Sequence, residues 1–315
     1  NALQRYIVRR LLGGVPVLLG ISLLAFVLAQ LSPGDPAEIM LEAAGTGMPS
    51  AEEVAALHSY LGLDQPAYVQ YGLWLWRILH GDGGISYHLG LPVFTVLLAR
   101  LPVTVMLAAA SLCWAAVGGI GLGLLMARMR GIWAAMLLHG VTQVMLATPS
   151  FLTAILLILV FGVWLHVLPT NGVDAAAGYL LPSFALALVT LAMTAQLLDA
   201  QLREALASLY AQTARLRGLS EGRVLLIYAL PNALVPVMAM LGNFAAAVLG
   251  GAIIVETVFA LPGIGSLALD AIHYRDYPLL QGYVLFLGGI YVLVTLAVDL
   301  VLARMDPRIV LGGGD

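Results

Sequence analysis

The chain has 315 residues, of which 61% are hydrophobic and only 10% are charged, and its formal net charge is −3. Because soluble domains are typically about 25% charged, this composition indicates a membrane protein and excludes an ordinary soluble domain. We therefore expect membrane lipid, and no nucleic acid, among its partners.

Six long stretches carry no Asp, Glu or Arg. They cover residues 11–34, 101–127, 131–173, 175–198, 224–255 and 277–298. Each is long enough for the roughly 20 apolar residues of a membrane-spanning helix. The sequence therefore predicts an all-α membrane protein with six transmembrane helices and an external segment after the first helix.

The run at 131–173 is long enough for two spans, and Pro149 interrupts it. Arginines concentrate on the cytoplasmic side of membrane proteins. With six spans and both termini cytoplasmic, only Arg77, Arg100 and Arg275 of the arginines lie outside. A seventh span would move the arginines of a later loop across the membrane, so the run is predicted to be one long helix interrupted by proline.

The N-terminal stretch has the basic flank of a signal peptide, but its apolar core is too long, which predicts a retained first span over 1–31. The external segment follows at 32–100. Ser50 is predicted to start a short helix at 51–61. The spacing of Tyr68, Tyr71 and Leu75 predicts a second helix, lying on the outer membrane face with Trp74 and Trp76 at headgroup level or forming part of a small periplasmic cap.

The remaining core, 101–315, is predicted to hold five spans and a cytoplasmic loop at about 199–232. Gly119 and Gly123 in its first helix predict close helix packing. Cys113 is expected to be a small buried apolar residue. Asn243, at membrane depth, is predicted to face protein or a water-filled path.

A short charged helix at 203–217 dominates the cytoplasmic loop. Arg215 and Arg217 fall in its last turn, Gly218 is placed for a left-handed C-cap, and Ser220 can cap a second helix. This helix could lie along the inner leaflet or be a plain connector. Its sharp end favours docking into a partner. The residues expected to form one apolar stripe are Leu202, Leu206, Leu209, Thr213 and Leu216.

Several kinds of chemistry have no support in the sequence. The chain contains no lysine, which a P-loop requires, and no HExxH motif. Its histidines lack ligand spacing, although those predicted to be external leave a weak metal-handling role open: His58, His80, His88 and His273. We expect no catalytic residue, cofactor or metal site in this chain.

The cytoplasmic loop resembles the EAA loop of ABC importer permeases, with Glu204, Ala205 and Tyr210 followed by "TARLRGLS" and "PNALVP". Nearly end to end, the chain resembles the dipeptide, oligopeptide and nickel permease family. The matching stretches include "RYIVRRLL", "GDP", "LGLDQPAYVQY", "GDGGIS", "TPSF", "ETVFALPGIG", "RDYPLLQG" and "VDLVLARMDPRI". The chain departs from the family at Asp199, Ala207 and Leu209, where relatives often carry Arg, Gly and Asp.

The resemblance implies a type I ABC importer permease in the bacterial inner membrane, and not an enzyme. Its expected partners are a second homologous permease, two ATP-binding subunits that hold ATP and Mg, and a periplasmic or lipid-anchored solute-binding protein. The implied substrate is nickel, free or chelated, or a short peptide, with glutathione as an alternative. A self-sufficient secondary transporter or channel remains the contrasting interpretation, and an intramembrane enzyme a third.

The resemblance and the predicted topology together name three groups of site residues. The residues expected to couple the chain to an ATPase are Glu204, Ala205, Tyr210, Ala214, Arg215, Arg217, Gly218 and Leu219. Those expected to dock the binding protein or gate the external side are Asp35, Asp64, Gln65, Tyr68, Arg77, Arg275 and Asp276. Asn243 and Glu256 are expected on the translocation path.

Overall fold

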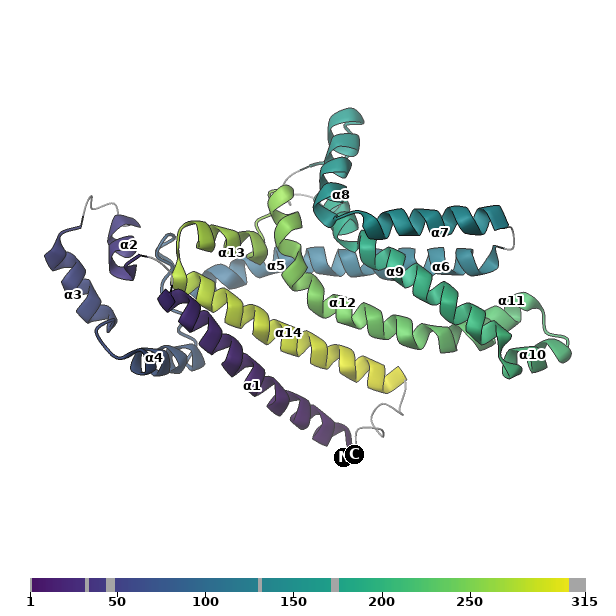
Figure 1. Cartoon of the computed structure of the whole chain (residues 1–315), viewed down its shortest axis with the longest axis horizontal. Coiled ribbons are helices and arrows are strands. Elements are labelled where there is room, and N and C mark those ends of the chain that lie inside the picture. Colours follow the sequence, from purple (N-terminus) through teal and green to yellow (C-terminus); the bar gives the residue numbers. More distant parts are fainter. Residues whose placement is uncertain (1, 32–33, 44–48, 130–131, 171–175, 306–315) are drawn as a thin grey trace. The chain divides into compact units, whose positions relative to one another are not determined.

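A computed structural model of the chain describes residues 2–31, 34–43, 49–129, 132–170 and 176–305, and the regular structure in these ranges is helical (Figure 1). The helices are α1 (Ala2–Leu31), α2 (Pro36–Ala43), α3 (Ala51–Leu61), α4 (Ala67–Leu79), α5 (Val93–Cys113), α6 (Gly119–Arg128), α7 (Ile132–Ala147), α8 (Ser150–Leu157), α9 (Leu180–Ala207), α10 (Leu209–Leu216), α11 (Glu221–Arg223), α12 (Leu230–Val258), α13 (Ile264–His273) and α14 (Tyr277–Met305). Short π-helical turns extend α5, α8 and α11, and a 3-10 turn precedes α9.

Five helical stretches of the described chain are long and apolar enough to cross a membrane. They are Ile7–Leu31, Val93–Arg128, Ala176–Ala207, Glu221–Gly250 and Tyr277–Arg304. Each overlaps one of the uncharged runs in the sequence. The all-helical prediction is therefore confirmed, with a sixth span if the helices of the remaining run are counted as one.

That remaining run does not form one long helix. The segments Trp133–Ala147 and Ser150–Trp164 meet at 103°, across the break at Thr148 and Pro149 (Figure 1). Proline has no N–H to donate and drives the residue before it out of helical geometry, and here Pro149 itself is extended, with ψ 145°. The predicted interruption is confirmed, and it is a sharp break instead of a kink.

The chain divides into two compact units. One comprises Thr104–Leu261 with the two chain ends, and the other comprises Val8–Val103 with Pro262–Val292. The division of the sequence into 1–31, 32–100 and 101–315 stays a prediction.

In the unit that contains α1, the aromatic face of α4 packs on that helix. The Phe26 ring lies 5.4 Å from Tyr71 in a T-shaped pair and 6.0 Å from Trp74, and the Tyr71 hydroxyl lies 2.8 Å from Ser22 Oγ. Such aromatic pairs contribute roughly 0.5–1.5 kcal/mol beyond buried area. Trp74 therefore packs against α1, whereas Trp76 is exposed.

The same unit holds α2, α3 and the turn before α4 together through polar contacts. The predicted helix start at Ser50 is confirmed as a reciprocal capping box with Glu53. Asp35 caps α2 by accepting the Ala37 N–H at 2.9 Å, and its carboxylate also meets His58 Nε2 at 2.7 Å. Partial burial raises the pKa of Asp35, but the hydrogen bonds of His58 and the backbone outweigh it, and the net pKa is lowered.

Asp276, in the same unit, fixes the loop before α5. Its buried carboxylate caps α14 by accepting the Leu279 N–H at 3.2 Å, and it also accepts hydrogen bonds from the Ser86 hydroxyl and the His88 N–H. Burial raises the pKa of neighbouring Tyr87 to about 12, helped by the charge of Asp276, so this phenol stays neutral. The loop is therefore held rigidly against the start of α14.

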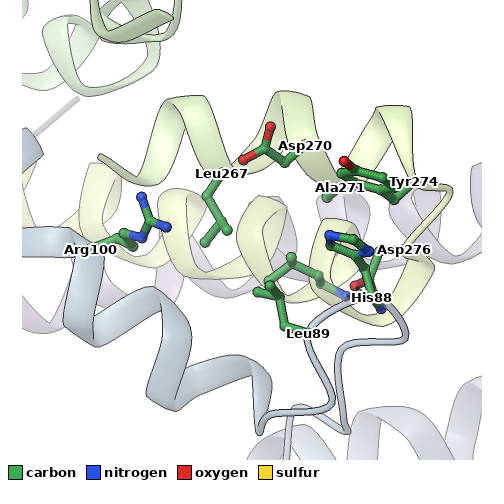
Figure 2. Close-up of a pocket in the computed structure, with 9 residues that line it drawn as sticks. His88, Leu89, Arg100, Leu267, Asp270, Ala271, Tyr274 and Asp276 are labelled. Atoms are coloured by element: carbon green, nitrogen blue, oxygen red, sulfur yellow. Dashed lines mark hydrogen bonds between the residues drawn. The ribbon is translucent and has the colours of Figure 1, made fainter. Parts of the chain in front are cut away.

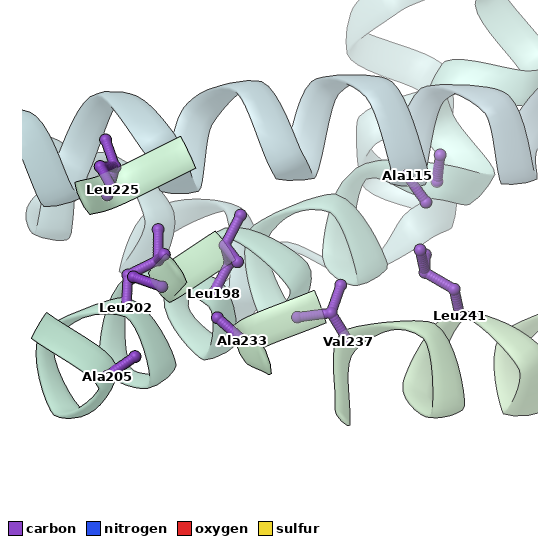
Figure 3. Close-up of a cluster of buried hydrophobic side chains, with 10 residues drawn as sticks. Ala115, Leu198, Leu202, Ala205, Leu225, Ala233, Val237 and Leu241 are labelled. Carbon is purple, nitrogen blue, oxygen red and sulfur yellow. The ribbon is translucent and has the colours of Figure 1, made fainter. Parts of the chain in front are cut away.

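The other unit is organised around α9, which packs against α6, α7, α8 and α12. Its apolar core combines residues of α9, α12 and the neighbouring π-helical turns, as Figure 3 shows. The core residues are Ala115, Ala187, Leu198, Leu202, Ala205, Leu225, Ala229, Ala233, Val237 and Leu241. Half of these residues are alanines, which lets the helix backbones approach closely.

Glycines allow α6 and α9 to approach each other closely. A Cβ built on Gly119 would lie 2.5 Å from Thr194 Cβ, and one on Gly123 would lie 2.8 Å from the Ala195 carbonyl oxygen. The predicted role of both glycines in helix packing is confirmed. Cys113, at the end of α5, is exposed, so the expectation that it is buried was wrong.

Candidate functional sites

Residues 203–223, which we name the α9–α10 elbow, contain most of the charge that stood out in the sequence. The predicted single helix over 203–217 is wrong, because α9 ends at Ala207 and α10 begins at Leu209. Ser208 between them is extended (φ −69°, ψ 158°), and its hydroxyl donates to the Ala205 carbonyl. This local hydrogen bond competes with the helix ladder and turns the chain.

The break at Ser208 also removes the predicted apolar stripe. Leu202 and Leu206 belong to α9, whereas Leu209 and Leu216 are 81% and 89% exposed on α10. The helical phase restarts after Ser208, so spacing counted across it cannot hold. The side chains that α10 buries are instead those of Ala211 and Ala214.

Gly218 ends α10 as predicted. Its φ is +80°, its N–H donates to the Arg215 carbonyl at 2.9 Å, and the Leu219 N–H donates to the Ala214 carbonyl at 3.3 Å. These paired bonds define a Schellman cap, which favours glycine at the left-handed position. Ser220 lies where the next helix begins, but its side chain makes no capping hydrogen bond.

Four of the eight predicted coupling residues build the elbow from within. Ala214 packs with Ala211 and Val224, while Leu219 lies against this small core. Ala205 is part of the main core. Arg215 connects the parts of the elbow, because its Nη1 donates to the Leu206 carbonyl at 2.9 Å and its Nε donates to Glu221 Oε1 at 2.9 Å. These groups set the shape of the elbow.

The other four predicted coupling residues point outward: Glu204, Tyr210, Arg217 and Gly218 are exposed. Leu209 and Leu216 of α10 are also exposed, which the spacing of apolar residues in the sequence did not predict. Two exposed leucines on one short helix favour a protein contact over plain hydration. The position of Ser208, a residue that favours helix caps, is the signal that could have revealed them.

Next to the elbow, Asp199 joins α9 to α7. Its side chain is 4% exposed, it accepts bonds of 2.9 Å and 3.0 Å from Arg203 Nε, and His139 Nε2 lies 3.5 Å away. One α-helical turn separates Asp199 from Arg203, which suits an ion pair. The departure from the family at Asp199 is therefore compensated within the chain.

Replacing Arg203 with Ala is expected to destabilise this unit by about 1–3 kcal/mol, because the buried Asp199 carboxylate loses its charged donor. Thermal unfolding in detergent measures this. Arg128→Ala, at an exposed site on α6, is the matched control. Equal melting temperatures for the two variants would contradict the role of the ion pair, and Arg203→Ala combined with Asp199→Ala should recover part of the loss.

The two residues predicted for the translocation path differ in environment. Asn243 is exposed on α12. Glu256, on the same helix, is fully buried and accepts a hydrogen bond from Thr104 Oγ1 at 2.6 Å. In this conformation Glu256 joins α12 to α5, and its place on the path stays a prediction.

The predicted external residues do not form one cluster. Asp35 and Asp64 are brought together by His58, whose Nδ1 lies 3.7 Å from Asp64 Oδ1. Gln65, Tyr68 and Arg77 are exposed on or before α4, and Arg275 is exposed with a φ of +54°. Asp276 is buried and accepts hydrogen bonds from Ser86, His88 and Leu279, and its predicted role stays a prediction. Among the described residues, no three His, Cys, Asp or Glu side chains group as metal ligands.

Comparison with known proteins gives the family. Residues 119–311 match the model of the binding-protein-dependent transport system inner membrane component. Residues 3–108 match the N-terminal model of the same transport system membrane components. The chain belongs to this family. It is therefore a multi-pass inner-membrane protein and a permease subunit of an ABC importer, which is not itself catalytic.

Full-length relatives agree with this assignment. The permease is 38% identical over 311 residues to a Brucella suis protein assigned as a peptide transport system permease, covering 96% of this chain and 98% of the relative. It is 36% identical over 304 residues to the glutathione transport system permease protein GsiC of Escherichia coli K12, with the same coverage.

Two solved structures share the fold. The MetNI methionine ABC transporter, in inward-facing conformations, gives a TM-score of 0.56 at 16% identity, covering 67% of the permease and 97% of that chain. An amino acid ABC transporter solved with histidines gives 0.51 at 18% identity, covering 68% and 94%. At these identities the likeness shows the fold alone. Family membership implies in general that an ATPase and a binding protein are partners.

Proposed function

We propose that the permease forms half of the translocation pathway for short peptides or peptide-like compounds such as glutathione. It pairs with a second homologous permease, two ATP-binding subunits that hold ATP and Mg, and a periplasmic or lipid-anchored binding protein. The single observation that carries the substrate class is the identity of 36–38% over nearly the whole chain to permeases named for peptide and glutathione transport.

The orientation that we propose has both termini in the cytoplasm, because it leaves only Arg77, Arg100 and Arg275 outside. The α9–α10 elbow then faces the cytoplasm. Its exposed residues Leu209, Tyr210 and Leu216, with Glu204 and Arg217 beside them, would enter a cleft of the ATPase. ATP binding and hydrolysis on that partner would then move the elbow and switch the spans between outward-open and inward-open states.

Nickel, which the sequence left open, gains no support from the relatives named above. The ligand retained by the cognate binding protein tests the substrate directly, by native mass spectrometry combined with metal analysis. A retained peptide or glutathione would support the proposal. Stoichiometric nickel, free or chelated, without a peptide would refute it.

We further propose that the exposed part of the segment around α4 docks the binding protein, because Asp64, Gln65, Tyr68 and Arg77 present polar and aromatic groups there. Replacing Tyr68 with Ala is expected to weaken binding of the cognate protein to the complex in nanodiscs about tenfold or more, the cost typical of a buried aromatic anchor. Leu73→Ala, at another exposed position on α4, is the control. Unchanged affinity for Tyr68→Ala would refute docking at this residue.

A further inference from the structure

A small pocket outside the elbow and the spans' core has no role in the proposed mechanism. It has a volume of about 60 Å³ and lies between α13, the first part of α5 with the loop before it, and the start of α14, all within the unit that contains α1 (Figure 2). At roughly 10–15 Å³ for each water-sized group, this is room for about four to six non-hydrogen atoms. The pocket therefore suits the head of a small molecule.

The pocket is preformed, because contacts within the unit hold its walls. The rings of His88 and Tyr274 stack at 3.6 Å with only 6° between their planes. Asp276 holds the same loop through the Ser86 hydroxyl and the His88 N–H. A ligand entering such a site loses little affinity to ordering of the protein.

Two opposite charges line the pocket without meeting. The Arg100 guanidinium is half-buried and the Asp270 carboxylate is exposed, and neither side chain has a hydrogen bond or ion pair with any residue that the structure describes. In Figure 2 the two side chains stand at separate edges of the pocket, with Leu267 between them. The Asp276 carboxylate also lines the pocket and accepts hydrogen bonds from the Ser86 hydroxyl and the His88 and Leu279 N–H groups, and it forms no ion pair with Arg100 among the described residues.

The chemistry of these walls selects a ligand with both charges. Arginine binds carboxylates with two parallel hydrogen bonds, and a carboxylate binds an ammonium group in the same way that it binds a lysine. Leu267 and Leu279 add an apolar wall to the same pocket. A ligand with only one charge would leave the other protein group unpaired.

We propose that this pocket binds the zwitterionic α-amino acid head of a small molecule. The carboxylate lies on Arg100, the ammonium group lies on Asp270, and the connecting carbon lies against Leu267 and Leu279. An α-amino acid head has about five non-hydrogen atoms, which matches the volume. The γ-glutamyl end of glutathione carries such a head, so identifying the ligand with the transported cargo rests on the proposed function, whereas the binding itself does not.

Scintillation proximity with radiolabelled glutathione tests the proposal, using the complete transporter in nanodiscs without the binding protein. Saturable binding is expected, and Arg100→Gln and Asp270→Asn are each expected to weaken it at least tenfold. Arg128→Gln, at an exposed arginine far from the pocket in sequence and in the other unit, is expected to change nothing. Melting temperatures of the variants establish that they are folded, and Arg100→Lys, which keeps the charge, should recover part of the affinity.

Competition separates the ligand classes. Glutamate is expected to displace the label, whereas N-acetylglutamate, which lacks the ammonium group, is not. The proposal is overturned if no saturable binding occurs, if the pocket variants bind normally, or if N-acetylglutamate competes as well as glutamate. ATP-driven uptake of glutathione with the binding protein present is measured on the same complexes. Uptake without this binding would refute the proposed pocket and leave the proposed function standing. Binding without uptake would support the pocket and refute the proposed function.

Discussion

Replacing Gly218 with Trp is expected to abolish ATP-driven uptake while the permease still inserts and assembles. Gly218 has a φ of +80°, and a Cβ there would meet nothing of this chain within 4 Å. The indole would therefore project from the end of α10 into the space that the partner cleft is proposed to occupy. Adopting the left-handed conformation costs an L-residue about 1–2 kcal/mol, too little to unfold the elbow.

Gly218→Ala separates the two effects, because alanine carries the backbone strain without the bulk. It should retain most of the uptake, while the tryptophan variant should retain basal ATP hydrolysis but no transport in proteoliposomes. Unchanged uptake in Gly218→Trp would refute the docking role. An equal loss in Gly218→Ala would assign the effect to the conformation of the elbow alone.

Replacing Gly123 with Leu is expected to prevent stable folding of the unit built on α9. A Cβ at this position would lie 2.8 Å from the Ala195 carbonyl oxygen and 3.2 Å from Ala195 Cα, and backbone atoms cannot move aside as a side-chain tip can. Overpacking of this kind costs about 1–3 kcal/mol even for added methylenes, and a whole leucine forces the helices apart. Thermal unfolding in detergent, followed by size-exclusion chromatography, measures the loss.

Gly121 provides a matched control two residues away on the same helix, since a Cβ there meets nothing within 4 Å. Gly121→Leu should keep a melting temperature close to that of the original chain. If both leucine variants unfold alike, the loss would come from replacing any glycine of α6 with leucine, and not from the contact of α6 with α9.

The features that the sequence predicted well depend on local composition. Uncharged runs mark the spans, Ser50 marks the start of α3 and Gly218 marks the end of α10, because each reports a requirement of a few neighbouring residues. Pro149 likewise predicted an interruption. The 103° angle of that break is set by the packing of α7 and α8 on α9, which the sequence does not reveal.

The α9–α10 elbow shows why the site was only partly predictable. Counting apolar spacing through Ser208 places Leu209 and Leu216 in one stripe with Leu202 and Leu206, whereas the extended Ser208 restarts the helical phase and leaves both leucines exposed. The hydrogen bonds of Arg215 to the Leu206 carbonyl and to Glu221 could not be predicted from its motif, and its coupling role stays a prediction. The contact of Asp35 with His58 depends on how α3 packs beside α2, and the contact of Asp199 with Arg203 depends on the side-chain rotamers. The sequence predicts neither.

The most direct test of the account is uptake by purified components in proteoliposomes. The permease, its permease partner, two ATPase subunits and the binding protein loaded with peptide or glutathione are combined, with ATP enclosed in the liposomes. We expect uptake that requires both ATP and the binding protein, and none from this chain alone. Uptake by this chain alone, driven by an ion gradient and unaffected by ATP, would contradict it.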